Sequence, residues 1–311
     1  MEWKVVIANT GEDSITIIDF KNDYEIKEIS FISLLDKAKG VDICLDKQPI
    51  GPWDIALDKE KNKIYLANAY NNSISKIDIN KMNIESILAV GKFPSTIKIY
   101  DGFIFVLNED SNSISIVDKK SFNLIGNISV GDKPEDMEMY NFSKKIFIAN
   151  GNGHSVDIID LENNKKEKLI LSNNPIRLCL EKEYMYILSH SNESFSEHSN
   201  ISIVRLDNLS IVKSLDIEGV CNNMLKLREK DILFLTSLQD GHLYKVDLKA
   251  NKIIKKIYLE GMPNKIFWDG NKSLLITNTS KNTLTIFNIF NNKVIKNIKV
   301  GSEPNGLILI K

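Results

Sequence analysis

The sequence predicts an all-β fold, a seven-bladed β-propeller of four-stranded antiparallel blades. Three observations predict it: a turn phrase recurs roughly every 42 residues, each repeat holds four short runs of strand-forming residues, and the two ends of the chain supply complementary parts of one repeat. Repeats of this length with strand periodicity are typical of propeller blades and not of helical solenoids. We therefore expect a single propeller domain over 1–311, with insertions at about 32–49 and 191–198.

The first run of each repeat follows an anchor position, which is proline in six of the seven repeats. As GKFPSTIKI and GDKPEDMEM illustrate, each anchor places a turn before a short apolar stretch. The seven anchors are Pro52, Pro94, Pro134, Pro175, Asn222, Pro263 and Pro304.

The second run is apolar and closes on Asn or Ser, and the third run alternates with period two and closes on Asp or Asn. Asn suits a turn because it tolerates left-handed backbone angles, and Asp caps a turn through hydrogen bonds from backbone amides. We interpret both closing residues as turn residues and not as a catalytic carboxylate set. The second-run positions are Asn9, Asn68, Asn108, Asn150, Ser189, Ser237 and Asn278, and the third-run positions are Asp19, Asp78, Asp118, Asp160, Asp207, Asp247 and Asn288.

A fourth run, such as IESILAV or VIKNIKV, leads to the next anchor. The chain begins at a second-strand run, VVIAN, and ends with a first-strand run, NGLILI. One blade is therefore expected to be closed by strands from both termini, which leaves no free edge at the join.

The GxxP anchor, the IYLAN and IFIAN strands, the SISIVD strand and the period together resemble the YVTN family of β-propeller repeat proteins. The resemblance covers essentially the whole chain and implies the propeller fold. For function it implies either a binding protein, since the family includes exported binding proteins and surface-layer components, or an enzyme related to quinoproteins and lactonases.

The charge balance argues against a nucleic-acid partner. The chain has 40 basic and 41 acidic side chains, for a net charge of −1, and only Arg177, Arg205 and Arg228 are arginines. A polyanion therefore meets no positive field and few side chains suited to bidentate phosphate contacts. We expect no nucleic-acid binding.

The three cysteines, Cys44, Cys179 and Cys221, are too few and too widely spaced for a disulfide framework or a CxxC metal knuckle. Small buried hydrophobes in a reducing compartment are the expected interpretation. No apolar run approaches the roughly 18 residues of a membrane span, and the N-terminal residues do not resemble a signal peptide. We expect a cytoplasmic monomer with no membrane span.

Two repeats carry extra residues. Blade five holds SHSNESFSEHSN between its second and third runs, and the first repeat holds SLLDKAKGVDICLDKQ before the next anchor, where a short amphipathic helix from Leu34 to Ala38 is expected. Both insertions are expected on one face of the propeller, at the mouth of its central channel, and loops on a rigid scaffold often carry binding. Insertions that a surface loop simply tolerates are the alternative.

All four histidines fall in the loops between the second and third runs of blades four, five and six, together with Glu193, Glu197 and Asp240. Imidazole and carboxylate groups are ordinary acid–base groups and ordinary ligands of divalent ions. Solvated turn residues are the alternative interpretation. The candidate catalytic residues are thus His154, His190, His198 and His242, and the candidate metal ligands are His190, His198 and His242.

Period two in the first run predicts that one face of this strand enters the core between blades and the other faces the channel. Acidic and basic side chains nearly balance on the channel face, so ion pairs with ordered water are one interpretation and a ligand site is the other. The candidate ligand-binding residues are Asp54, Asp136, Arg177, Lys265 and Glu138.

Two functional classes follow. The first is a non-enzymatic binding or interaction propeller that holds an unknown protein, peptide or small ligand at the channel mouth and inserted loops of one face. The alternative is a propeller enzyme, lactonase-like or metal-dependent, that uses the arc of histidines. The sequence has no GxSxG elbow, Walker loop or dinucleotide fingerprint, which favours the first class. No cofactor is expected, and a divalent metal belongs only to the alternative.

Overall fold

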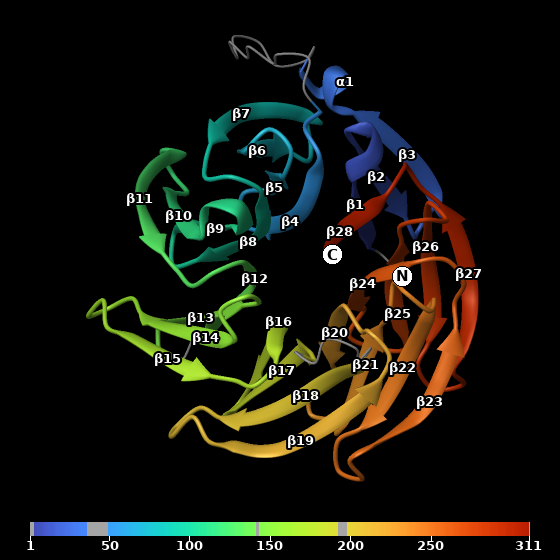
Figure 1. Cartoon of the computed structure of the whole chain (residues 1–311). Helices are drawn as coiled ribbons and strands as arrows, with labels where there is room; N and C mark the ends of the chain where they lie inside the picture. The colour runs from blue at the N-terminus through green and yellow to red at the C-terminus, as the bar shows by residue number, and fades with distance from the viewer. Residues whose placement is uncertain (1–2, 36–48, 141–142, 192–197, 311) are drawn as a thin grey trace. The chain divides into compact units, whose positions relative to one another are not determined.

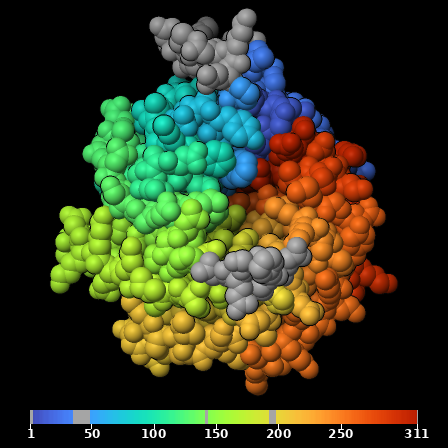
Figure 2. Space-filling view, viewed as in Figure 1, coloured from blue at the N-terminus to red at the C-terminus, as the bar shows by residue number. Residues whose placement is uncertain are grey.

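The computed structural model describes residues 3–35, 49–140, 143–191 and 198–310, and the remaining residues are grey in Figure 1 and Figure 2. Across these ranges the chain forms seven four-stranded antiparallel sheets, the blades of a seven-bladed β-propeller, which confirms the predicted fold class. Within the same ranges the helices are α1 (Phe31–Leu35) and two 3-10 turns, Thr10–Glu12 and Glu109–Ser111. None of these described helices has the length and apolar character needed to cross a membrane.

The chain divides into two compact units. One comprises Met1–Ser129, Thr277–Thr285 and Lys296–Lys311, and the other comprises Val130–Ile276 and Ile286–Ile295. The prediction of a single domain over 1–311 stays a prediction.

Three blades belong to the first unit. Blade one is β28 (Pro304–Ile310), β1 (Lys4–Asn9), β2 (Ser14–Asp19) and β3 (Glu25–Ser30). Blade two is β4 (Pro52–Asp58), β5 (Lys63–Asn68), β6 (Ser73–Asp78) and β7 (Asn83–Ala89). Blade three is β8 (Pro94–Tyr100), β9 (Phe103–Asn108), β10 (Ser113–Asp118) and β11 (Asn123–Ser129).

Three blades belong to the second unit, and a seventh has residues in both units. Blade four is β12 (Pro134–Tyr140), β13 (Lys145–Asn150), β14 (Ser155–Asp160) and β15 (Lys166–Ile170). Blade five is β16 (Asn174–Glu181), β17 (Tyr184–His190), β18 (His198–Arg205) and β19 (Ile211–Glu218). Blade six is β20 (Asn223–Lys226), β21 (Ile232–Thr236), β22 (His242–Asp247) and β23 (Lys252–Tyr258). Blade seven is β24 (Pro263–Trp268), β25 (Ser273–Asn278), β26 (Thr283–Asn288) and β27 (Lys293–Lys299).

Blade one is closed by strands from both ends of the chain, as predicted. Its inner strand β28 pairs antiparallel with β1, with Lys4 opposite Ile310 and Ile7 opposite Leu307. Figure 1 shows the red C-terminal strand beside the blue N-terminal strand. The backbone hydrogen bonds of this pairing replace the free edge that each terminus alone would expose.

The anchor prolines open inner strands. Proline is the first residue of β4, β8, β12, β24 and β28, where a missing backbone N–H is tolerated. In blades two to four a β-bulge follows the proline, between Pro52 and Asp54, Pro94 and Thr96, and Pro134 and Asp136. The bulge sets which way the next side chains of the inner strand point.

Apolar side chains pack in layers between neighbouring blades. In the first unit Ile55 of β4 packs with Val6 and Ala8 of blade one, whereas the next residue, Ala56, packs with Ile97 of blade three. Both faces of this inner strand therefore contact neighbouring blades. This corrects the prediction that alternate residues of the strand face a channel, because the side chains on each face of a wedge-packed sheet meet another sheet.

The two insertions are described only in part. Helix α1 begins at Phe31, three residues before the predicted start, because Phe31 and Leu34 are both buried in the layer between blades one and two. The rest of the predicted helix, to Ala38, and Cys44 lie outside the described residues. So does the blade-five stretch 192–197, which contains Glu193 and Glu197.

Candidate functional site

Two of the predicted ligand-binding carboxylates join consecutive inner strands. In the first unit the backbone N–H of Ile97 donates to Asp54 Oδ2 at 3.1 Å. In the second unit the N–H of Leu178 donates to Asp136 Oδ2 at 2.9 Å. Each carboxylate lies two residues after its anchor and accepts from the first strand of the next blade. Both therefore have an architectural contact, and ligand binding by either stays a prediction.

Arg177 belongs to a polar chain along the inner strands of the second unit. Its guanidinium donates to the carbonyl of Glu135 at 3.0 Å and to Asn223 Oδ1 at 3.0 Å. Asn223 in turn donates to Asn264 Oδ1 at 2.7 Å. The chain thus links blades four to seven through side chains on inner strands. The other two predicted residues are half-buried and take part in further interactions: Lys265 and Glu138.

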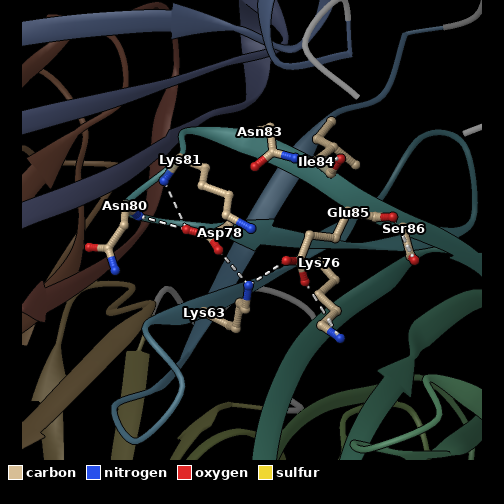
Figure 3. A network of polar contacts seen from close by, with 9 residues as sticks. All are labelled: Lys63, Lys76, Asp78, Asn80, Lys81, Asn83, Ile84, Glu85 and Ser86. Atoms are coloured by element: carbon tan, nitrogen blue, oxygen red, sulfur yellow. Dashed lines mark hydrogen bonds and ion pairs between the residues drawn. The ribbon is translucent and has the colours of Figure 1, made fainter. Parts of the chain in front are cut away.

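The aspartates that close the third strands cap turns, as predicted, except Asp207, which forms an ion pair with Arg205. Figure 3 shows blade two, where Asp78 Oδ1 accepts the N–H groups of Asn80 at 2.9 Å and Lys81 at 2.8 Å. Asp78 Oδ2 accepts from the Lys63 ammonium at 2.6 Å, which lowers the pKa of Asp78, and Glu85 accepts from the same ammonium. Equivalent capping bonds occur at Asp19, Asp118, Asp160, Asp247 and Asn288. The hydrogen bonds and ion pairs around Asp78 therefore stabilise the fold of blade two.

The asparagines that close the second strands bridge two strands, a role that the sequence interpretation missed. In blade two the Asn68 amide donates to Ser73 Oγ at 2.9 Å and Ser75 Oγ at 2.7 Å on β6. The same bridge joins Asn9 to Ser14 and Thr16, and Asn108 to Ser113 and Ser115. The spacing Asn-x4-Ser-x-Ser/Thr was present in the sequence and could have indicated it.

These asparagines are not left-handed, which corrects the turn interpretation. Asn9 has φ −105 and ψ 97, and Asn108 has φ −109 and ψ 101, both extended. The left-handed position lies just before the third strand instead. Its occupants are Asp13, Asn72, Asn112, His154, Gly241 and Asn282.

His154 therefore fills a turn position that other blades give to Asn, Asp or Gly. Its φ is 46, and its Nδ1 is buried without a hydrogen-bond partner among the described residues. Asn is the residue that most readily adopts this conformation after Gly. The place of His154 is explained by the turn, and a catalytic role for it stays untested.

The two blade-five histidines lie on neighbouring strands. His190 ends β17, and its Nε2 lies 2.8 Å from the carbonyl oxygen of Cys221. His190 pairs with Ser199, next to His198, which opens β18 and is exposed. Among residues 3–35, 49–140, 143–191 and 198–310, no group of three His, Cys, Asp or Glu is placed to hold a metal ion. Metal binding by His190, His198 or His242 stays a prediction.

Blade six departs from the bridging pattern and gathers polar and aromatic groups on one face. Ser237 stands where five other blades have Asn, and His242 and Tyr244 of β22 stand where blade two has Ser73 and Ser75. Residues two apart on a strand share a face. Opposite them on β23 lie Tyr258, paired with His242, and Lys256, paired with Tyr244. We name this group, with Asp240 of the preceding loop, the blade-six site.

Asp240 organises the blade-six site. Its Oδ2 accepts from the Tyr244 hydroxyl at 2.6 Å and from the Lys256 ammonium at 2.9 Å. Burial raises the pKa of Asp240, but the hydrogen bonds from Tyr244 and Lys256 outweigh it and hold the pKa below its ordinary value. Burial and the bond to Asp240 raise the pKa of Tyr244 to about 12, and bonds to Tyr244 and Asp240 raise the pKa of Lys256. At neutral pH the carboxylate and ammonium are both charged and paired.

His242 is oriented by the same loop. Its Nδ1 lies 2.7 Å from the backbone carbonyl oxygen of Asp240 and 3.4 Å from the carboxylate Oδ2. A carbonyl oxygen only accepts, so Nδ1 carries a hydrogen and, in the neutral ring, Nε2 holds the lone pair. The imidazole is 24% exposed and lies 5.1 Å from the Tyr258 ring, which is 63% exposed. The Tyr258 ring and the Lys256 side chain, which is 46% exposed, are thus the most exposed parts of the site.

The described cysteines are not activated. Burial raises the pKa of both Cys179 and Cys221 to about 12, so each is a thiol at neutral pH. Cys179 packs with the apolar layer between blades five and six, and Cys221 is fully buried in it. This confirms the interpretation of Cys221 as a small buried hydrophobe, whereas Cys179 is half-buried at the edge of the same layer.

No protein-family model matches the sequence, and no curated protein matches it. Solved structures do match. They include a 6-phosphogluconolactonase-like protein from Bacteroides fragilis (TM-score 0.76, 13% identity, 100% of this chain and 98% of that chain). A protein from Lactobacillus plantarum matches with a TM-score of 0.75 at 11% identity over 100% of both chains. Apo AztD from Citrobacter koseri matches with a TM-score of 0.67 at 12% identity over 99% of this chain and 97% of that chain. At these identities the similarity shows the fold alone, so this chain shares the seven-bladed β-propeller with a lactonase-like protein and with AztD.

Proposed function

We propose that the chain is a binding or interaction propeller without a catalytic centre, and that the blade-six site is part of its binding surface. The observation that carries the proposal is the pairing of the site's charged groups with each other. Asp240 is held as an anion by Tyr244 and Lys256, and Tyr244 stays a neutral phenol. A general base needs a pKa near the working pH, and neither Asp240 nor Tyr244 has one.

The same pairing suits recognition. An ion pair between the Asp240 loop and strand β23 fixes one geometry, and an exposed aromatic ring supplies contact area at low conformational cost. Tyr258 is 63% exposed beside this fixed group. The partner is a protein, peptide or small ligand, and the repeat phrases further support kinship with the YVTN propellers.

The test compares partner capture by the full chain with capture by two variants. Tyr258→Ser removes the exposed ring of the blade-six site, and Phe290→Ser removes an equally exposed ring, 65% exposed, from the turn after β26. Proteins captured by the wild type are identified, purified and measured by calorimetry. We expect Tyr258→Ser to weaken binding at least tenfold, about 1.4 kcal/mol, and Phe290→Ser to leave it unchanged. Equal binding by all three would overturn the placement of the surface.

A hydrolase is the second candidate, favoured by one observation. His242 Nδ1 lies near the Asp240 carboxylate, the arrangement in which a carboxylate orients an imidazole whose other nitrogen acts as a base. A proton-release assay with simple lactones, run on the wild type and on His242→Ala, separates the two functions. Turnover that disappears in His242→Ala would establish the enzyme and overturn the binding proposal.

A further inference from the structure

We propose that Arg177, on an inner strand of the second unit, binds the carboxylate of a small organic acid together with the buried amide of Asn223. This site is separate from the blade-six site on β22 and β23, so the inference goes beyond the proposed function. It follows from the fixed orientation of one guanidinium, from the hydrogens that it leaves unused, and from its lack of a carboxylate partner among the described residues.

The guanidinium of Arg177 is held in one orientation by acceptors that carry no charge. Nε donates to Asn223 Oδ1 at 3.0 Å, and Nη1 donates to the carbonyl oxygens of Glu135 at 3.0 Å and Ile176 at 2.6 Å. These acceptors belong to β20, β12 and β16, the inner strands of blades six, four and five (Figure 1). Three blades together therefore position the planar group before a ligand binds, which lowers the entropic cost of binding.

Two hydrogens of the guanidinium have no acceptor. An arginine side chain has five N–H donors, and the three bonds use Nε and both hydrogens of Nη1, so the two on Nη2 remain without an acceptor in the described part of the chain. Asn223 is 5% exposed, and its amide donates one hydrogen to Asn264 Oδ1 at 2.7 Å, while no described residue accepts the second. Asn223 Oδ1 is already occupied by Arg177. The hydrogen-bonding capacity left at this place is therefore made up of donors.

The positive charge of Arg177 is not matched by a carboxylate. Over residues 3–35, 49–140, 143–191 and 198–310, its guanidinium forms hydrogen bonds only to uncharged oxygens and no ion pair. Two acidic residues at the start of β12 are engaged elsewhere: Glu135 pairs with Lys133 at 3.2 Å, and Asp136 accepts the N–H of Leu178 at 2.9 Å. Arg177 is half-buried, so water screens its charge only in part.

Other buried cations of the chain are compensated. Three lysines whose side chains are 3% to 16% exposed each have a carboxylate partner: Lys63 with Asp78, Lys119 with Asp58, and Lys226 with Glu181. Lys245, which meets the oxygens of Ile289 and Asn292, has a pKa lowered by burial and by Lys230. A guanidinium keeps its proton throughout the physiological range of pH, so Arg177 has no such relief. An anion paired with it would remove an electrostatic cost that the fold leaves in place.

The place of Arg177 in the repeat also departs from the architectural pattern. In blades two and four the position two residues after the anchor holds Asp54 or Asp136, and each accepts a backbone N–H of the next blade's inner strand. A guanidinium has no acceptor, so Arg177 cannot make this bond to blade six. Blade five thus replaces an architectural acceptor by a charged donor, and such departures from a local rule are expected at functional positions.

The surrounding charge suits a monoanion. The equivalent positions on β12, β16, β20 and β24 hold one acidic, two basic and one neutral residue, which sum to +1: Asp136, Arg177, Met224 and Lys265. Glu138, the next acidic residue along β12, lies two residues further from the anchor and has interactions of its own. A single surplus charge matches a carboxylate better than a phosphate dianion. The oxygens of a carboxylate accept from the Nη2 and amide hydrogens, and such charge-assisted bonds are the strong ones.

The test uses the chain's three arginines as reporters. Full-length protein with 15N-labelled arginine is titrated with sodium acetate at pH 7, with sodium chloride adjusted so that the ionic strength stays constant. The Nε–H signals are assigned by substituting each arginine with lysine in turn. We expect the Arg177 signal to shift saturably, because acetate binds the adjacent Nη2. Arg205, which is already paired with Asp207 at 2.6 Å, and the exposed Arg228 should show no saturable shift.

Two further probes check the ligand chemistry. Acetamide has the shape of acetate without its charge, so it should bind about tenfold more weakly or less. Inorganic phosphate at the same ionic strength should bind no more tightly than acetate.

Two variants and a matched control locate the site. Asn223→Asp places a carboxylate against Nε and should weaken acetate binding by about tenfold, because the internal anion competes for the charge. Arg177→Gln should abolish acetate binding, whereas Arg205→Gln, which removes an exposed arginine, should leave it unchanged. Saturation transfer to the acetate methyl group measures all three, and circular dichroism reports whether each is folded. Asn223→Asp keeps the side-chain volume, so it decides the question even if Arg177→Gln does not fold.

An unmoved Arg177 signal, equal shifts of all three arginine signals, or acetamide binding as tight as that of acetate would overturn the proposal. So would unchanged acetate binding by folded Asn223→Asp, and tighter binding of phosphate would overturn the assignment to a carboxylate. None of these results changes the comparison of partner capture by the wild type and Tyr258→Ser, which concerns the blade-six site. Failure of this inference is therefore distinguishable from failure of the proposed function.

Discussion

The carboxylate of Asp136 gives a quantitative test of how neighbouring blades are held together. It is 7% exposed and accepts the backbone N–H of Leu178, which is 4% exposed, at 2.9 Å. Asp136→Ala removes the acceptor and leaves a buried donor without a partner. Such a group costs about 1 to 3 kcal/mol, because its bond to water in the unfolded chain is not replaced. We expect the free energy of unfolding to fall by about that amount.

The assay is urea unfolding followed by far-UV circular dichroism, with two matched variants. Asp136→Asn keeps a carbonyl oxygen in place and should lose less than half as much stability as Asp136→Ala. Asp207→Ala removes a carboxylate that is 54% exposed and paired with Arg205, and exposed pairs contribute about 0 to 1 kcal/mol. A loss below about 0.5 kcal/mol for Asp136→Ala would refute the reasoning. If that variant also lost partner binding, Asp136 would be a ligand contact as the sequence suggested.

Three further outcomes are expected. Asn108→Ala removes the amide that bridges to two serine hydroxyls and should lower the free energy of unfolding by about 1 to 2 kcal/mol, measured by urea unfolding against Asn123→Ala on an exposed edge strand. The pKa of Asp240 is lowered in the folded chain, so Asp240 stabilises the fold fully above its unfolded pKa, near 4, and loses this effect as pH falls through its folded pKa. Asp240→Asn should therefore flatten the fall of the melting temperature between pH 5 and pH 2. An unchanged pH profile would contradict this. Cys179 and Cys221 should resist iodoacetamide at pH 8 in the folded chain and react in urea, as read by peptide mass spectrometry, because their thiols have pKa values of about 12; fast labelling of either in the folded chain would show an accessible thiolate.

Several elements followed from the sequence because the forces that set them are local. The prolines mark the first residues of inner strands, and the capping aspartates mark the ends of third strands, since both act within a few residues of themselves. The number of blades follows from the number of repeated runs, and the closure of blade one follows from the complementary runs at the two ends of the chain. The sequence analysis missed one further feature that the repeat shows, the glycine before the anchor proline. A Cβ at Gly91 would lie 2.5 Å from the side chain of Asn108, so glycine at this position leaves room for the bridging asparagine.

The functional interpretation needed distances between segments far apart in the chain. Asp54 was predicted to meet a ligand, and only the structure shows that it also accepts from Ile97 of the next blade, beside the bulge after Pro52. Four histidines formed one arc in the sequence, but His154 occupies a turn position and His242 belongs to a separate group. Side-chain direction is set by register, and a shift of one residue reverses it.

The sequence by itself determined the repeat, the four strands of each blade and the capping role of most third-strand aspartates, because hydrophobic period and turn propensity act over a few residues. Only the tertiary structure decided what the irregular residues do. Lys256 and Tyr258 drew no attention in the sequence, and they gained a role when the pairing of β22 with β23 set them opposite Tyr244 and His242. The physical reason is that the charge and hydrogen bonding of a site depend on cross-strand neighbours, which the spacing of residues along the chain does not specify.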